Sequence, residues 1–77
     1  MPRLILTYDQ VLAILLAHGF TLKRNDGGSH RRYEAVIKGK IRYVDLAPHR
    51  WSDNVKPGTL SSIMRQSALS KKAWRGQ

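Results

Sequence analysis

The 77-residue sequence contains no cysteine and few acidic residues. Without cysteine the chain can form no disulfide, no thiol nucleophile and no zinc site with thiolate ligands. The five acidic residues lie scattered along the chain: Asp9, Asp26, Glu34, Asp45 and Asp53. This scatter disfavours a hydrolase that uses two paired carboxylates, and it disfavours a carboxylate site for Mg²⁺. The sequence therefore predicts neither a cofactor nor a metal.

The sequence also lacks an apolar run long enough to cross a membrane. Its main apolar stretch, residues 11–17, follows the polar residues 7–10 rather than a basic flank. No small-residue cleavage site of the kind that ends a signal peptide comes after it. We interpret the stretch as a core helix of a cytoplasmic protein.

The charge is strongly positive, because 14 Lys and Arg residues against 5 Asp and Glu residues give a formal net charge of +9. Hydrophobic residues make up 42% of the chain, which suffices for the core of one small domain. A basic domain of this kind binds polyanions, so we expect nucleic acid as its partner, and an anionic membrane surface as the second choice. Many of the cations fall within residues 23–50, and none lies between Arg3 and His18.

The first predicted helix has recognisable ends. Thr7 is a suitable N-cap, and Gln10 stands three residues later, as in a capping box. The apolar residues at positions 11, 12, 14, 15 and 16 form a wide stripe that would face a core. Gly19 supplies a left-handed stop, and His18 in the last turn is expected to be a surface cap.

A second helix is predicted to begin at Pro57, where the missing amide hydrogen costs nothing. Its last turn holds Arg65, and Ser70 is placed to cap a short final helix over residues 71–74. The apolar stripe of the second helix consists of Leu60, Ile63 and Met64.

Three short antiparallel strands are predicted between these helices. The expected strands are residues 20–24, 30–38 and 41–46, joined by turns at 25–29 and 39–40, and a loop at 47–56 leads to the second helix. Alternation would place Tyr33, Ala35 and Ile37 on one face of the middle strand, with His30, Arg32 and Glu34 on the other. The third strand would direct Val44 and Leu46 inward. The predicted fold is α+β, with two helices on one face of a three-stranded sheet.

His30 is the best candidate for acid–base chemistry. It follows the glycine-containing turn, and the neighbouring cations Lys23, Arg24, Arg31 and Arg32 could hold a phosphodiester. A histidine in this setting can take a proton from a ribose 2′-hydroxyl or donate one to the leaving oxygen. The residues alone equally fit a basic hairpin that binds RNA without cutting it.

Other side chains have less specific signals. His49 lies in a loop beside Arg50 and could contact phosphate or simply face solvent. Trp51 and Trp74 could stack on bases, although a tryptophan in so small a domain is at least as often a core anchor. A regulator that reads DNA is favoured less, because Arg65 is the one long cation of the second helix.

Two motifs resemble the HicA family of toxins. Residues 28–30, Gly-Ser-His, are followed by Tyr33, as in the family's G-S-H-x-x-aromatic signature. Residues 56–69 are similar to its K-P-G-T-L-x-x-I-x-x-Q-x-x-L helix. The likeness extends from about Thr7 to Ser70.

This resemblance implies a single α-β-β-β-α domain like that of double-stranded-RNA-binding proteins, over residues 1–77 with a basic tail from about residue 70. It also implies an endoribonuclease that cleaves mRNA, with His30 as its catalytic residue, and a HicB-like antitoxin that neutralises it. A non-catalytic RNA-binding module that acts by occupancy is the alternative.

The sequence departs from the family pattern at several places. Arg31 stands where many members have a second histidine, and the segment 38–40 is shorter than the usual hairpin. Ala68 occupies a position where glycine commonly ends the second helix, and the tail beyond Ser70 is basic rather than acidic.

Overall fold

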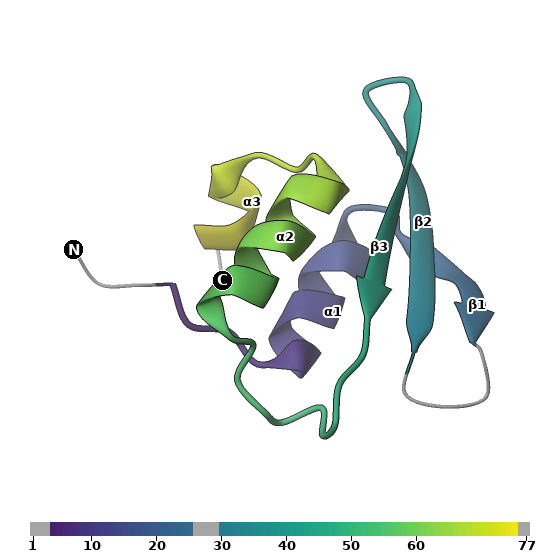
Figure 1. Ribbon diagram of the computed structural model, residues 1–77. Helices are drawn as coiled ribbons and strands as arrows, with labels where there is room; N and C mark the ends of the chain where they lie inside the picture. The colour runs from purple at the N-terminus through teal and green to yellow at the C-terminus, as the bar shows by residue number, and fades with distance from the viewer. Residues whose placement is uncertain (1–3, 26–29, 76–77) are drawn as a thin grey trace.

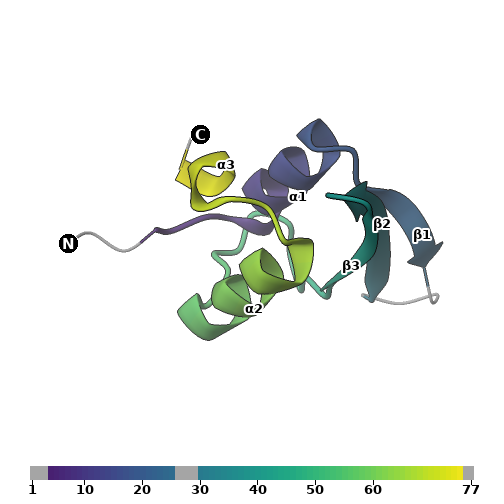
Figure 2. The same ribbon diagram turned by 90° about the horizontal axis from the view of Figure 1, so that it is seen from above.

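The computed structural model describes residues 4–25 and 30–75 of the chain, shown in Figure 1. In chain order the elements are α1 (Tyr8–Ala17), β1 (Thr21–Asn25), β2 (Arg31–Ile37), β3 (Lys40–Leu46), α2 (Pro57–Ser67) and α3 (Lys71–Arg75). The strands form one antiparallel sheet in the order β1-β2-β3. The helices lie on one side of this sheet and leave its other face open (Figures 1 and 2). The predicted α+β fold and element order are confirmed.

Local capping signals set the ends of α1. The Thr7 hydroxyl accepts a hydrogen bond from the Gln10 amide at 3.2 Å, and the Gln10 side chain accepts one from the Thr7 amide at 2.9 Å. Gly19 ends the helix with φ +92°, and His18 Nδ1 lies 2.9 Å from the Ile14 carbonyl. The predicted capping box, glycine stop and histidine cap are confirmed. The predicted apolar stripe wrongly included Leu16, which is exposed.

The turn between β2 and β3 sets the register of the sheet. Lys38 and Gly39 both have positive φ, at 53° and 81°, as a two-residue hairpin turn requires. The turn lies one residue earlier than predicted, so β3 begins at Lys40 instead of residue 41. This register pairs Tyr33 with Val44 and Arg32 with Asp45.

Strand β1 differs from the prediction of a half-buried strand over residues 20–24. The strand begins one residue later, all five of its residues are exposed, and Leu22 is 51% exposed. The reason is the position of the helices, because α2 packs on β3, at the opposite side of the sheet from β1. Phe20 alone of the predicted segment enters the core, just before the strand starts. The predicted turn residues 26–29 lie outside the described part of the chain.

The core lies between the sheet and the helices. Its apolar members are Leu6, Val11, Ile14, Leu15, Phe20, Tyr33, Ala35, Val44, Leu46, Val55, Leu60, Ile63 and Trp74. They include the predicted inward residues of β3, together with Tyr33 and Ala35 of β2, while Ile37 is half-buried.

The second half of the helical layer follows the prediction closely. Helix α2 begins at Pro57, and it ends at Ala68, which takes the left-handed conformation with φ 58° although it is not glycine. Helix α3 extends one residue beyond the predicted segment and buries Trp74 completely. A buried indole cannot stack on RNA bases, so the core role of Trp74 is the correct alternative. Among the described helices, none is both long and apolar enough to span a membrane.

Candidate functional site

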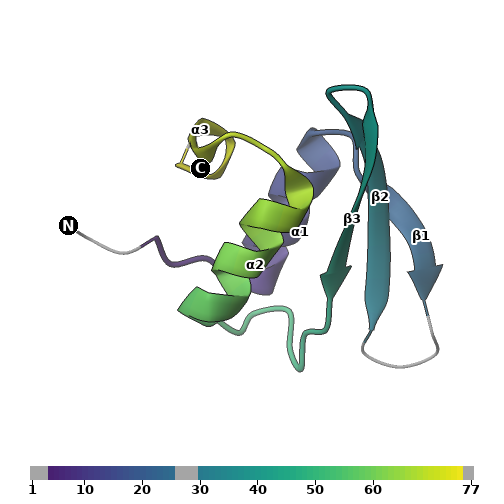
Figure 3. The same ribbon diagram turned by 45° about the horizontal axis from the view of Figure 1, so that its top comes forward.

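The end of the sheet that bears His30 forms a basic hollow. Strands β1 and β3 end here, β2 begins here, and the loop to α2 leaves from the same end (Figure 3). His30 is exposed and lies directly before β2, so the prediction that this strand begins at His30 was wrong by one residue. The hollow is lined by Arg24, His30, Arg31, Arg32 and Asp45.

Strand pairing explains why these residues meet. Arg24 of β1 lies opposite Arg32 of β2, and Arg32 in turn lies opposite Asp45 of β3. A shift in register between Leu22 and Arg24 interrupts the regular alternation of β1. The three strands thus bring side chains that are up to 21 positions apart in the sequence (24 to 45) to one end of the sheet.

Arg32 is held in place by two neighbours on β3. Its Nε donates to Asp45 Oδ1 at 2.8 Å, and its Nη2 donates to Asp45 Oδ2 at 3.2 Å, which is the two-pronged geometry that guanidinium groups favour. Its Cζ atom also lies 5.4 Å from the centroid of the Tyr43 ring, within the range of a cation–π contact. Arg32 therefore presents a guanidinium of fixed orientation.

Within residues 4–25 and 30–75, Asp45 is the one acidic group that lines the hollow. The hydrogen bonds from Arg32 lower the pKa of its carboxyl group, partial burial opposes the shift, and the charges of Arg32 and His30 add to the lowering. Asp45 is therefore ionised at neutral pH. The described lining residues thus contribute three guanidinium groups against one carboxylate, and this excess of positive charge suits a phosphodiester.

Side chains alternate between the two faces of β2, so Arg31 faces away from the side of Arg32 and reaches the loop between β3 and α2. Its Cζ atom lies 5.2 Å from the centroid of the Trp51 ring. The backbone holds Trp51 in turn, because its carbonyl accepts a hydrogen bond from the Asp9 amide at 2.9 Å. The Tyr8 amide donates to the Asp53 carbonyl at 3.1 Å nearby. The start of α1 thus fixes the loop that supports Arg31.

Lys23 is not among the residues that line the hollow at His30. It lines a neighbouring hollow together with Arg24, Arg32 and Tyr43, and its Nζ atom is 3.4 Å from Glu34 Oε2. The two hollows share Arg24 and Arg32, so the basic surface continues from His30 across the open face of the sheet.

Four of the predicted site residues therefore meet at one hollow, namely His30, Arg24, Arg31 and Arg32. His49 is exposed and is not among the residues that line it, so its role in phosphate binding stays a prediction. Prediction missed Asp45 and Tyr43, which strand register alone brings beside Arg32. In the described part of the chain, no three His, Asp or Glu side chains gather in a way that could hold a metal ion.

A comparison with protein families matches residues 8–69 to the model described as the HicA toxin of bacterial toxin–antitoxin systems. The chain belongs to the HicA toxin family. The matched segment runs from α1 through α2 and contains every residue of the basic hollow, whereas α3 and the segment before α1 lie outside it. A comparison with curated proteins finds no match. As a HicA toxin, the protein has an antitoxin as its partner.

Two departures from the family pattern have a structural outcome in this HicA toxin. Arg31 replaces the second histidine and packs on Trp51, so its charge stays at the hollow. Ala68 forms the left-handed end of α2 that a glycine usually forms, and its amide donates to the Arg65 carbonyl at 3.2 Å.

Proposed function

We propose that this toxin is an endoribonuclease that cleaves mRNA in the cytoplasm without a metal ion and thereby inhibits translation. The observation that supports the proposal is the hollow at the start of β2. There an exposed imidazole, the His30 side chain, lies among three guanidinium groups and the Asp45 carboxylate, counting the described residues. Imidazole is the side chain best suited to move protons near neutral pH, and the arginines suit the phosphate.

The proposed chemistry uses the RNA's own 2′-hydroxyl group as the nucleophile. When His30 acts as a general base, it removes the 2′-hydroxyl proton, and the 2′-oxygen attacks the adjacent phosphorus. The bond from phosphorus to the 5′-oxygen breaks, and that oxygen takes a proton from water. The products are a 2′,3′-cyclic phosphate and a 5′-hydroxyl end. When His30 acts as the acid instead, water takes the 2′-hydroxyl proton and His30 donates a proton to the leaving 5′-oxygen.

The cations would stabilise the charge that builds up on the phosphoryl oxygens. Arg32 is best prepared for this role, because Asp45 and Tyr43 already fix its orientation and little entropy remains to be lost. Arg24 and Arg31 line the same hollow, and Lys23 continues the surface along the bound strand. In this proposal, His49 contributes at most to RNA binding from the adjacent loop.

The direct test compares His30→Ala with His18→Gln in the otherwise unchanged protein. His18 is a matched control because it caps α1 at the other end of β1. RNA would be incubated with each protein in excess EDTA. We expect the parent and His18→Gln to release fragments with cyclic phosphate ends, whereas His30→Ala loses at least about 100-fold in rate, as loss of a general acid or base does. Cleavage by His30→Ala at the parent rate would overturn the proposal.

A second substrate separates this chemistry from direct attack of water on the phosphodiester. An RNA with a 2′-deoxy residue at the cleaved position has no internal nucleophile, so we expect it to stay intact. The alternative function, inhibition by occupancy, predicts something different. His30→Ala would then still inhibit translation, and inhibition would weaken steeply with salt because counterion release drives phosphate binding.

A further inference from the structure

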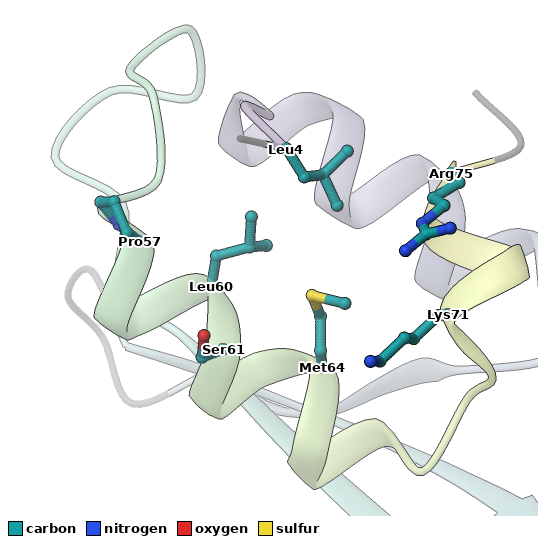
Figure 4. A pocket seen from close by; sticks show the side chains of 7 residues that line it. All are labelled: Leu4, Pro57, Leu60, Ser61, Met64, Lys71 and Arg75. Carbon is teal, nitrogen blue, oxygen red and sulfur yellow. The ribbon is translucent and has the colours of Figure 1, made fainter. Parts of the chain in front are cut away.

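A groove with an apolar floor lies between the segment before α1 and the helices α2 and α3 (Figure 4). Its volume is about 410 Å³. Leu4, Leu60 and Met64 turn their side chains towards the same space, and the nitrogen atoms of Lys71 and Arg75 extend towards it from α3 (Figure 4). Leu4 and Met64 are only partly buried against the core, so their apolar surface remains open at the groove.

A second apolar hollow of about 300 Å³ continues this groove. Both are lined by Leu4 and Pro57, and the second also contains Ile5, which is 66% exposed. The backbone around it is firmly placed, because the Val55 amide donates to the Leu6 carbonyl at 2.8 Å. Together the hollows form a trough along the segment before α1, which we call the helix-side groove.

The charge of the helix-side groove has one sign. Lys71 and Arg75 stand at one hollow and Lys56 at the other, and none of the described residues that line them is Asp or Glu. An apolar floor with a cationic rim fits a segment that has apolar side chains on one side and carboxylates beside them.

We propose that the helix-side groove binds an acidic amphipathic segment of the antitoxin. Apolar side chains of that segment would cover Leu4 and Met64, and its carboxylates would pair with Lys71 and Arg75. The proposal rests on the antitoxin partnership of the family and not on the nuclease activity proposed above. It adds a contact outside the basic hollow, since the two surfaces share no residue.

A protein segment suits this groove better than RNA does. Nucleic acid would need cations that follow a backbone and exposed aromatic faces on which bases stack. In the part of the chain that the structure describes, no aromatic side chain lines the groove, and α3 buries Trp74 in the core instead. Apolar surface of the kind that Leu4 and Ile5 expose is instead covered by apolar side chains of a protein.

The test measures how tightly the antitoxin binds, with the product of the reading frame adjacent to the toxin gene as the probe. In the binding measurements the toxin would carry His30→Ala so that it can be expressed. The added variants would be Lys71→Glu and Arg75→Glu. Lys72→Glu is the matched control, because it makes the same charge change on α3 at an exposed residue outside the groove. Melting temperatures would verify that each variant folds.

We expect each groove variant to weaken binding about 10-fold or more, and Lys72→Glu to stay within about 3-fold of the parent. A photo-reactive residue at Ser61, which is exposed in the groove, should cross-link to an acidic, apolar segment of the antitoxin. Equal loss in Lys72→Glu, or no loss in any variant, would overturn the proposal, as would an adjacent product that does not bind.

The remaining results would also overturn it. If Lys71→Glu and Arg75→Glu weakened RNA binding and left antitoxin binding unchanged, the groove would be a nucleic-acid surface. If they instead broke up a toxin dimer, the occupant would be a second copy of this chain. Cleavage assays with His30 intact distinguish these outcomes from failure of the proposed function, because the groove variants should cleave RNA at the parent rate.

Discussion

Trp74 should be the side chain on which the C-terminal part of the fold depends most. It lies in a five-residue helix too short to be stable alone, yet its relative exposure is 0% and it belongs to the core. Replacing a buried tryptophan with alanine costs about 3–5 kcal/mol. A 77-residue domain has a free energy of unfolding of only about 4–12 kcal/mol. Trp74→Ala should therefore remove a large share of the stability.

The melting temperature is the practical measure of this loss. For domains of this size, 1 kcal/mol corresponds to about 4–8 °C, so Trp74→Ala should melt at least about 12 °C below the parent. Lys72→Ala, an exposed change in the same helix, should stay within about 0.5 kcal/mol. A melting temperature of Trp74→Ala within about 4 °C of the parent would refute the burial of this indole.

A second substitution at the same position separates packing from hydrogen bonding. The buried Nε1 atom of Trp74 has no hydrogen-bond partner among the described residues. Trp74→Phe removes that unsatisfied donor, which offsets part of the lost contact, so we expect a cost below about 1.5 kcal/mol. A cost equal to that of Trp74→Ala would show that the indole nitrogen is bonded after all.

Two further predictions concern the end of α2 and the acid stability of the basic hollow. Ala68→Gly should raise the free energy of unfolding by about 1 kcal/mol, because Ala68 has φ 58°, which glycine adopts without strain. Ala13→Gly inside α1 is the control and should lower the free energy of unfolding by a similar amount. Denaturant titration measures both changes. The pKa of Asp45 is lower in the folded protein than its unfolded value of 3.8. The pair with Arg32 therefore contributes its full stabilisation above pH 3.8, and this stabilisation is lost as the pH falls through the pKa of the folded state. Asp45→Asn should therefore lower the free energy of unfolding at pH 7, by less than about 1 kcal/mol because both side chains are about half exposed. The difference from the parent should shrink at pH 3. A difference that grows on acidification would contradict the pairing.

The sequence was most informative where structure depends on neighbours along the chain. The capping box of Thr7 and Gln10, the stop at Gly19 and the start of α2 at Pro57 all follow from local rules, and all are present. Arg31 and Arg32 could be associated with His30 for the same reason, since they adjoin it in the sequence.

Strand pairing was harder to predict, because a shift of the turn by one residue changes every pair of opposite residues on the two strands. A turn at residues 39–40 would have placed Arg32 opposite residue 47, whereas the turn at Lys38 and Gly39 places it opposite Asp45. Asp45 therefore looked like an isolated carboxylate. A tight turn with positive φ at Lys38 is unusual for a side-chain-bearing residue, and this concealed the register.

Burial depends on which strands the helices cover, and alternation cannot reveal that. The pattern of β1 suits a half-buried strand, yet β1 lies at the outer edge and its residues are exposed. The same limit applied to Trp74, whose core and stacking roles were both compatible with the sequence until α3 was placed.

The position of β1 has a consequence for attempts to disarm the toxin. An outer strand offers unpaired backbone groups that can join the sheet of another copy, and proteins prevent this with charged side chains and bulges. Strand β1 has both, in Lys23, Arg24 and the register shift beside them. These cations would thus keep copies of the chain apart as well as attract RNA. Replacing them with apolar residues invites aggregation, whereas a change at His30 leaves this protection intact.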